Sequence, residues 1–290
     1  MNAIRNDRLA AALDRAVDEG HTTELFELLR RNSGLPGPRP NLELARAVGA
    51  ALARREAQGE RLLGALATSE DEFPRIVAAL ALAERSLLAD ADKRPDKRKA
   101  AARTATALAD LQLIAEDARH VVRLGVIEAL RVRLDAVGEP AVLELAAWTD
   151  GYLQANVALE ALADKLLLTK LPSAEPVLAR LDEAFVLADQ SPRAAERSQG
   201  MRTLRQGLPA QIAVFAARYP EVLTWLEGKT ASKRPETREV VAEAIRAMRR
   251  AVISDVEAQR LGALLDASGK PRRDADRVVA GTRKRGRGRT

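Results

Sequence analysis

The sequence predicts an all-α protein. Alanine and leucine dominate the 290 residues, Ile, Val and Thr are sparse, and eight residues are aromatic. Ala, Leu, Arg and Glu are strong helix formers, whereas sheets favour β-branched and aromatic side chains. Apolar residues recur at helical spacing between turn residues along nearly the whole chain. We therefore expect helices throughout.

Turn residues delimit the predicted helices. Segment 34–40 has three prolines in five residues, which cannot continue a helix, and Asn41 behind it is a good N-cap. Pro74, Pro192 and Pro235 suit helix starts, whereas Pro209 should kink or divide its helix. Helices are predicted near 3–18, 23–32, 42–58, 60–67, 72–88, 95–115, 118–137, 140–149, 152–168, 174–188, 192–218, 220–227, 235–254 and 256–267.

Four of these segments share one plan. Each begins after an acidic or polar turn and carries a valine- and alanine-rich stripe that ends in Ala-Leu or Ala-Ile. The segments are 73–88, 118–134, 153–168 and 234–248. Their registers lie about 33 to 48 residues apart, the range of two- and three-helix solenoid repeats. We expect a helical pair over 1–33, a solenoid over 41–267 and a tail over 268–290.

The turns at 116–123 (EDARHVVR) and 233–238 (KRPETR) carry a family resemblance. They resemble the second helices of HEAT repeats, in which an Asp/Pro turn is followed by Val-Arg and an alanine-rich stripe. More specifically, 118–248 looks like a family of bacterial HEAT-like proteins, related in fold to the HEAT-like alkylpurine DNA glycosylases. The resemblance implies a right-handed α-solenoid of irregular HEAT-like, ARM-type repeats, and it implies little about function.

Composition excludes several classes of site. Without cysteine there is no disulfide framework and no thiolate chemistry, and His21 and His120 alone cannot build a histidine zinc site. No phosphate-binding glycine loop or G-x-S-x-G motif is present, so we expect neither a cofactor nor a metal. The first 20 residues alternate charged and apolar positions, unlike a signal peptide, and no run approaches the roughly 20 apolar residues of a membrane span. We expect a cytoplasmic protein without a membrane partner.

The basic charge resides at the C-terminus. The chain carries a net charge of +6, but 268–290 alone contains nine Lys and Arg against two Asp, which leaves about −1 for 1–267. Arginine interleaved with glycine predicts a disordered segment that binds phosphates without sequence preference. A solubilising tail without a partner is the alternative. The candidate nucleic-acid-binding residues here are Arg272, Arg273, Arg283, Lys284, Arg285, Arg287 and Arg289.

A second basic set lies within the predicted repeats. Equivalent positions of a solenoid share one face, so a stripe of cations could follow a phosphate backbone. For Arg123 and Arg238, pairing with a carboxylate of a neighbouring repeat is the favoured alternative. A separate cluster over 93–99, with Arg103, has a solvated turn as its simpler interpretation. The candidate residues of the repeats are Arg119, Arg202, Arg205, Lys233 and Arg234, beside Arg193, Arg197, Lys229 and His120.

Two further features bear on function. Six of the eight aromatic residues fall within 148–225. They could form a stacking surface for a base or sugar, and core packing is the simpler interpretation. The glycosylase resemblance implies an aspartate framed by tryptophans, and Asp150 beside Trp148 is the nearest match, although the spacing differs from the family's. Segment 135–164 holds six acidic residues and no Lys or Arg. This distribution of charge along the chain could orient a charged partner or produce head-to-tail self-contact, and a solvated acidic face is the equal alternative.

The sequence therefore favours a non-catalytic repeat scaffold that binds a macromolecule, most simply nucleic acid or another polyanion. Two alternatives stay open. One is an alkylation-repair enzyme like the DNA glycosylases, with Asp150 as its remote catalytic candidate. The other is a scaffold that binds only proteins.

Overall fold

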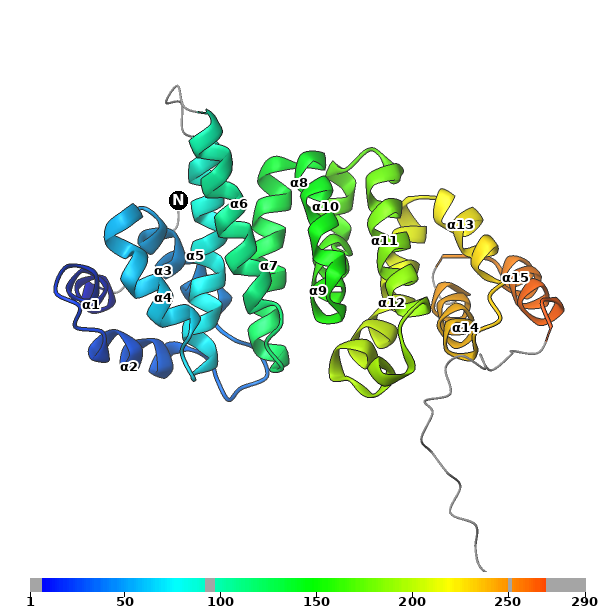
Figure 1. Ribbon diagram of the computed structural model, residues 1–290, viewed down its shortest axis with the longest axis horizontal. Coiled ribbons are helices and arrows are strands. Elements are labelled where there is room, and N and C mark those ends of the chain that lie inside the picture. The colour runs from blue at the N-terminus through cyan, green and yellow to red at the C-terminus, as the bar shows by residue number, and fades with distance from the viewer. Residues whose placement is uncertain (1–6, 92–96, 250–251, 270–290) are drawn as a thin grey trace, which may run out of the picture. The chain divides into compact units, whose positions relative to one another are not determined.

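The computed structural model describes residues 7–91, 97–249 and 252–269, and every regular element in these residues is a helix (Figure 1). Within them, no helix combines the length and apolar composition needed to cross a bilayer. The elements are α1 (Asp7–Asp18), α2 (Thr23–Asn32), α3 (Leu42–Ala53), the 3-10 helix η1 (Glu56–Gly59), α4 (Glu60–Ala67), α5 (Glu72–Asp90), α6 (Lys97–Ile114), α7 (His120–Val137), α8 (Glu139–Glu144), the 3-10 helix η2 (Leu145–Asp150), α9 (Tyr152–Leu162), α10 (Lys165–Lys170), α11 (Ala174–Asp189), the 3-10 helix η3 (Arg193–Arg197), α12 (Gln199–Arg218), α13 (Glu221–Lys229), α14 (Pro235–Arg249) and α15 (Asp255–Ala267).

The predicted all-α class is confirmed, with some changes of boundary. The segment predicted over 152–168 is two helices, because the Asp164 carboxylate accepts hydrogen bonds from the Leu166 and Leu167 amides and so begins α10. Pro209 does not divide its helix, since α12 continues through it. Asn41 caps α3 as predicted, with its side-chain oxygen accepting from the Leu44 amide.

The chain forms two compact units, Met1–Arg180 and Leu181–Thr290. In the first unit, α3, α5, α7 and α9 contact one another in succession. Helices α4 and α6 pack on α5, whereas α8 and α10 pack on α7 (Figure 1). Helices α1 and α2 contact each other and pack on α4 and α5 respectively. Helices α3, α5, α7 and α9 thus form one row, on which α4, α6, α8 and α10 pack.

Helix α5 is the core of the first unit, and its central residues from Ile76 to Ala83 are all buried. Two glycines let its neighbours approach closely. A Cβ on Gly49 of α3 would lie 2.9 Å from the Ala81 nitrogen, and one on Gly125 of α7 would lie 3.0 Å from the Ile76 Cα. Alanines on α5 and glycines on both neighbours therefore set the spacing of α3, α5 and α7.

A hydrogen-bond network around a buried arginine connects four helices of this unit. The Arg133 side chain of α7 is only 3% exposed, and its guanidinium donates to both carboxylate oxygens of Glu144 on α8, each at 2.7 Å. It also donates to Asp90 Oδ2 at 2.9 Å and to Ser86 Oγ at 3.0 Å, both on α5. Thr104 of α6 donates to the other Asp90 oxygen at 2.7 Å. Burial lowers the pKa of Arg133, but hydrogen bonds to Glu144 and Asp90 outweigh it and the pKa is raised.

One turn geometry recurs before α5, α7 and α14. A Ser or Asp side chain accepts a hydrogen bond from the backbone amide two residues later: Ser69 from Asp71 at 3.1 Å, Asp117 from Arg119 at 2.9 Å, and Ser232 from Arg234 at 3.3 Å. Six residues after each of these side chains stands an arginine whose guanidinium donates to a backbone carbonyl of the turn region: Arg75, Arg123 and Arg238.

The second unit is organised around α12 and α14, which pack on each other. Helix α13 contacts α12, and α15 contacts α14. Its buried side chains include Met201, Leu208 and Phe215 of α12 and Val241 and Met248 of α14. The end of α11 contributes Phe185 and Asp189 to this unit.

Candidate nucleic-acid interface

Arg119 is held by its own turn. Its guanidinium donates to both oxygens of Asp117, at 2.9 and 2.7 Å, and to the Glu70 carbonyl. Arg75 of the preceding turn also pairs with Asp117. The Asp117 side chain is 4% exposed, so these two arginines neutralise a buried carboxylate. Arg119 therefore stabilises the fold, and its charge is already compensated.

The environment of Asp117 makes stability depend on pH. Burial alone would raise its pKa, but the hydrogen bonds and positive charge of Arg119, with Arg75, lower the pKa to about 2 from an ordinary 3.8. A carboxylate with a lowered folded-state pKa stabilises the fold above its unfolded pKa and loses that contribution as the pH falls through the folded value.

We predict that Asp117→Asn lowers the free energy of unfolding by about 2 kcal/mol at pH 7, since one pKa unit corresponds to about 1.4 kcal/mol. The difference from the natural protein should shrink between about pH 4 and pH 2, over which Asp117 becomes protonated. Urea unfolding at several pH values measures it, with Asp135→Asn as control because that side chain is 57% exposed. A difference that stays constant from pH 6 to pH 2.5 would contradict the prediction.

Arg123 and Arg238 serve the fold, but with partners other than the expected carboxylates. The Arg123 guanidinium donates to the Asp117 and Ala118 carbonyls at 2.7 and 2.8 Å, and the residue is 4% exposed. Burial lowers its pKa, against the attraction of Asp117 and Glu160. Arg238 donates to the Ser232 carbonyl and also reaches Leu265 and Ser268 at the end of α15. Backbone carbonyls at helix ends are suitable acceptors for these cations.

Lys229 likewise pairs with a carboxylate, that of Asp182, which no sequence pattern indicated. Its ammonium lies 2.5 Å from Asp182 Oδ1 and 5.4 Å from the ring centres of Phe185 and Trp225. The Trp225 indole donates to the same oxygen at 2.7 Å, and its ring meets Phe185 edge-on. Burial would raise the pKa of Asp182, yet hydrogen bonds from Lys229 and Trp225 lower it. The one-turn spacing of Trp225 and Lys229 on α13 was the available sequence signal.

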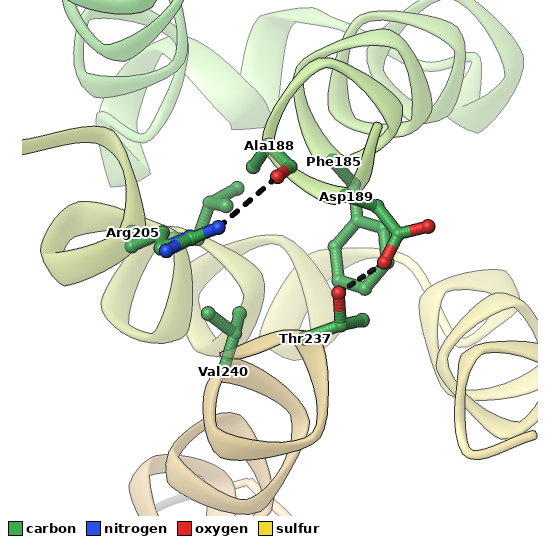
Figure 2. A pocket seen from close by; sticks show the side chains of 7 residues that line it. Phe185, Ala188, Asp189, Arg205, Thr237 and Val240 are labelled. Carbon is green, nitrogen blue, oxygen red and sulfur yellow. Dashed lines mark hydrogen bonds between the residues drawn. The ribbon is translucent and has the colours of Figure 1, made fainter. Parts of the chain in front are cut away.

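The end of α11 meets α12 and α14 at a small pocket (Figure 2). Phe185, Ala188 and Asp189 line it with Arg205 and Leu208 of α12 and Thr237 and Val240 of α14. The space enclosed among these side chains is about that of one water molecule, far below the size of small-molecule sites. The pocket is therefore a junction of helices, with Arg205 on one side and Asp189 on the other.

Residues on each wall of this junction form hydrogen bonds with the end of α11. Arg205 donates weakly to the Ala188 carbonyl at 3.4 Å (Figure 2). It also donates weakly to Ser191 Oγ, at 3.5 Å. On the other wall, Thr237 donates to Asp189 (Figure 2). Ser232 also donates to Asp189, at 3.5 Å. Because Ala188 and Asp189 are adjacent, Arg205 and the turn that begins at Ser232 lie at the same end of α11.

This geometry brings three of the predicted cations to one edge of the second unit, which we call the α12–α14 edge: Arg202, Arg205 and Lys233. Arg202 and Lys233 are exposed, and Arg205 is half-buried. Among the residues that the structure describes, none of the three forms an ion pair with a carboxylate. Arg234, in the same turn as Lys233, is half-buried and has other interactions. These cations are positioned to contact an external anion.

Several candidate residues lie outside the described residues. They include most of the 93–99 cluster and all of the predicted tail cations: Arg272, Arg273, Arg283, Lys284, Arg285, Arg287 and Arg289. Of the segment predicted as a tail, Ser268 and Gly269 are described, and Ser268 caps α15 while it accepts a hydrogen bond from Arg238.

Asp150 and Trp148 do not form a shared surface. Trp148 is 2% exposed in the core, whereas Asp150 is exposed at the end of η2. Trp225, the second tryptophan considered, bonds to Asp182 within the second unit. The core-packing interpretation also holds for Phe215 and Tyr219, which are both buried. In the described part of the chain, no group of three or more His, Asp or Glu residues is placed to hold a metal ion.

The described residues thus form an all-helical protein, and its second unit presents cations that no described carboxylate neutralises. Comparisons with protein-family models, with curated proteins and with solved structures give no match.

Proposed function

We propose that this chain is a non-catalytic HEAT-like repeat scaffold that binds nucleic acid through the α12–α14 edge and the basic segment 270–290. The observation that carries the proposal is the presence of cations without carboxylate partners at this edge. In contrast, Arg133 and Lys229 are neutralised by carboxylates, and Arg119 by Asp117. Phosphate groups would supply the compensating charge.

The charge balance of the two units supports the same assignment. Leu181–Thr290 contains 22 Lys and Arg against 14 Asp and Glu, a net +8, whereas Met1–Arg180 carries −2. A polyanion is therefore attracted to the second unit, chiefly by residues 270–290, which contribute +7 of this charge, and weakly repelled by the first. We expect fast, salt-sensitive association without sequence preference.

Two observations support the proposed repeat architecture. The recurrent turn before α5, α7 and α14 repeats the same hydrogen bonds with Ser69, Asp117 and Ser232. Many polar contacts also join residues 41 to 48 positions apart, within the first unit (Arg30–Asp71, Arg75–Asp117, Gln112–Gln154, Arg133–Asp90) and within the second (Trp225–Asp182, Thr237–Asp189). This interval is close to the roughly 40 to 47 residues of HEAT and armadillo repeats, which form right-handed solenoids.

We predict that the triple variant Arg202→Ala, Arg205→Ala, Lys233→Ala binds a 20-nucleotide fluorescent DNA about tenfold more weakly at 100 mM salt. Each lost phosphate contact should reduce the salt slope of the affinity by roughly 0.7 to 0.9. Fluorescence anisotropy from 50 to 300 mM KCl measures both quantities.

The matched control removes the same charge from the same unit. Arg246, Arg249 and Arg260 all pair with carboxylates, so the triple alanine variant at these positions should bind nearly as well as the natural protein. Equal weakening in both triples would reject the α12–α14 edge, and no binding by the natural protein would reject the function. Release of free base from methylated duplex DNA would instead support the glycosylase alternative.

A further inference from the structure

The last residue of η2 is followed by a glycine, and the two form the single Asp-Gly step of the sequence. Asp150 ends η2, and Gly151 follows in an extended conformation, with φ −126° and ψ 143°. In such a step the backbone nitrogen of the glycine can attack the aspartate side chain, because glycine has no side chain of its own to obstruct the approach. In a folded protein the reaction requires that neither group is held by a hydrogen bond.

Both reacting groups of this step are accessible. The Asp150 side chain is exposed, and it forms neither an ion pair nor a hydrogen bond with the described residues. The Gly151 amide donates to no described residue either. The nitrogen and the carboxyl group are therefore both available for reaction.

Other aspartates that end helices differ in the amide that follows them. The amide after Asp18, Asp90 or Asp189 donates to the carbonyl four residues before it, at 2.9, 3.0 and 2.8 Å respectively. Each of these amides completes the last turn of its helix, and its hydrogen bond keeps it from the preceding carboxylate. At Asp150 the chain instead leaves η2 in an extended conformation before α9 begins.

Packing explains why a glycine stands at position 151. A Cβ on Gly151 would lie 2.7 Å from Gln154 Oε1. Gln154 is buried, and its side chain accepts a hydrogen bond from Gln112 at 3.2 Å and donates one to Glu116 at 3.0 Å. A larger residue at position 151 would displace Gln154 from these contacts. The fold thus keeps an unobstructed amide beside Asp150.

We propose that Asp150 is a site of spontaneous isoaspartate formation in the folded protein. The Gly151 nitrogen bonds to Cγ of Asp150, and the carboxyl hydroxyl and the amide proton leave as water, which closes a succinimide ring. Water then opens the ring. Attack at Cγ restores aspartate, whereas attack at the α-carbonyl carbon leaves isoaspartate, in which the main chain runs through the side chain and the α-carboxylate is free. Water is the only co-reactant, so this modification does not depend on nucleic-acid binding.

The product would lengthen the main chain at the junction of η2 and α9. Isoaspartate adds one methylene group to the main chain before the Gly151 nitrogen. The Gly151 carbonyl accepts from the Ala155 amide at 2.8 Å in the first turn of α9, and Gln154 packs on Gly151. Because these contacts fix the position of Gly151, the isoaspartyl form should unfold at a lower urea concentration than the unmodified protein.

Peptide mapping of the folded full chain after four weeks at pH 7.4 and 37 °C tests the proposal. Trypsin releases 134–165, which contains Asp135, Asp150 and Asp164. Isoaspartate appears as a peptide of unchanged mass and shifted retention that accepts a methyl group from S-adenosylmethionine with isoaspartyl methyltransferase, and electron-transfer fragmentation assigns the residue. We expect roughly tenfold more at Asp150 than at the other two aspartates, whose following residues carry side chains. A zero-time sample corrects for isoaspartate formed during digestion.

Two variants and an unfolded reference complete the test. Asp150→Glu keeps the charge but would have to close a larger ring, so it should form no isomer at this position. Asp150→Asn replaces the carboxylate by a neutral amide that loses ammonia, so the folded variant should convert severalfold faster than the natural chain. The natural chain in 8 M urea measures the reaction without the fold. Isoaspartate at Asp150 in urea but not in the folded chain would overturn the proposal. Equal amounts at the three aspartates, none in either state, or a folded Asp150→Asn variant that stays unconverted would do so as well.

Discussion

Replacing Arg133 by methionine is expected to lower the free energy of unfolding by about 3 kcal/mol, the largest effect on stability that we predict for one side chain. Methionine fills much of the space, but the Asp90 and Glu144 carboxylates lose their shared cation and face each other across the junction of α5, α7 and α8. Both carboxylates remain about one-third exposed, at 39% and 34%, so water relieves part of the cost.

Urea unfolding followed by circular dichroism measures this effect, with Arg131→Met as the matched control on the same helix. The Arg131 side chain is 34% exposed, its ion-pair distance to Asp164 is 3.9 Å, and it donates one hydrogen bond to the Glu160 carbonyl at 3.1 Å. Its loss should therefore cost only about 1 kcal/mol. If both variants lost the same stability, Arg133 would not be the connecting residue that its buried geometry indicates.

Removing residues 270–290 is expected to weaken DNA or RNA binding at least tenfold at 50 mM salt. The segment carries nine Lys and Arg against two Asp, so its loss removes a net charge of +7. Contacts of this kind release counterions, and the affinity of the truncated protein should therefore depend less on salt. The truncation must keep Ser268, because its hydroxyl joins the end of α15 to Arg238 of α14.

The control is a chain in which the order of residues 270–290 is scrambled. Because phosphate neutralisation depends on composition and not on order, the scrambled chain should bind as the natural one does. Anisotropy titrations of the three proteins on the same oligonucleotide make the comparison. Unchanged affinity after truncation would remove this segment from the proposed function and leave the α12–α14 edge to be tested alone.

Much of the secondary structure was predictable because its signals are local. Helices α2 and α4 begin and end at the predicted residues, and the Asn41 cap follows from the residue type alone. The split at Asp164 was missed because the apolar pattern continues through it, although the Asp164 carboxylate caps the start of α10. Pro209 was expected to kink or divide α12, yet the remaining hydrogen bonds and the packing against α14 keep the helix continuous.

The candidate site was predictable only as a set of cations. Periodicity placed Arg119, Arg202, Arg205, Lys229 and Lys233 in comparable positions, but it could not distinguish their environments. Arg119 is neutralised by Asp117, and Lys229 by Asp182, which stands 47 residues earlier in the chain. Trp148 shows the same limit, since the sequence allows either a stacking surface or a core position and packing buries it.

The sequence by itself therefore determined the helical class, some helix boundaries such as the Asn41 cap, and the concentration of positive charge at the C-terminus. These properties follow from composition and from interactions within one or two turns of helix. Only the tertiary structure decided which cations are compensated, leaving Arg202, Arg205 and Lys233 without carboxylate partners among the described residues. The physical reason is that charge compensation and burial depend on partners brought together from more than 40 residues away, which no local pattern encodes.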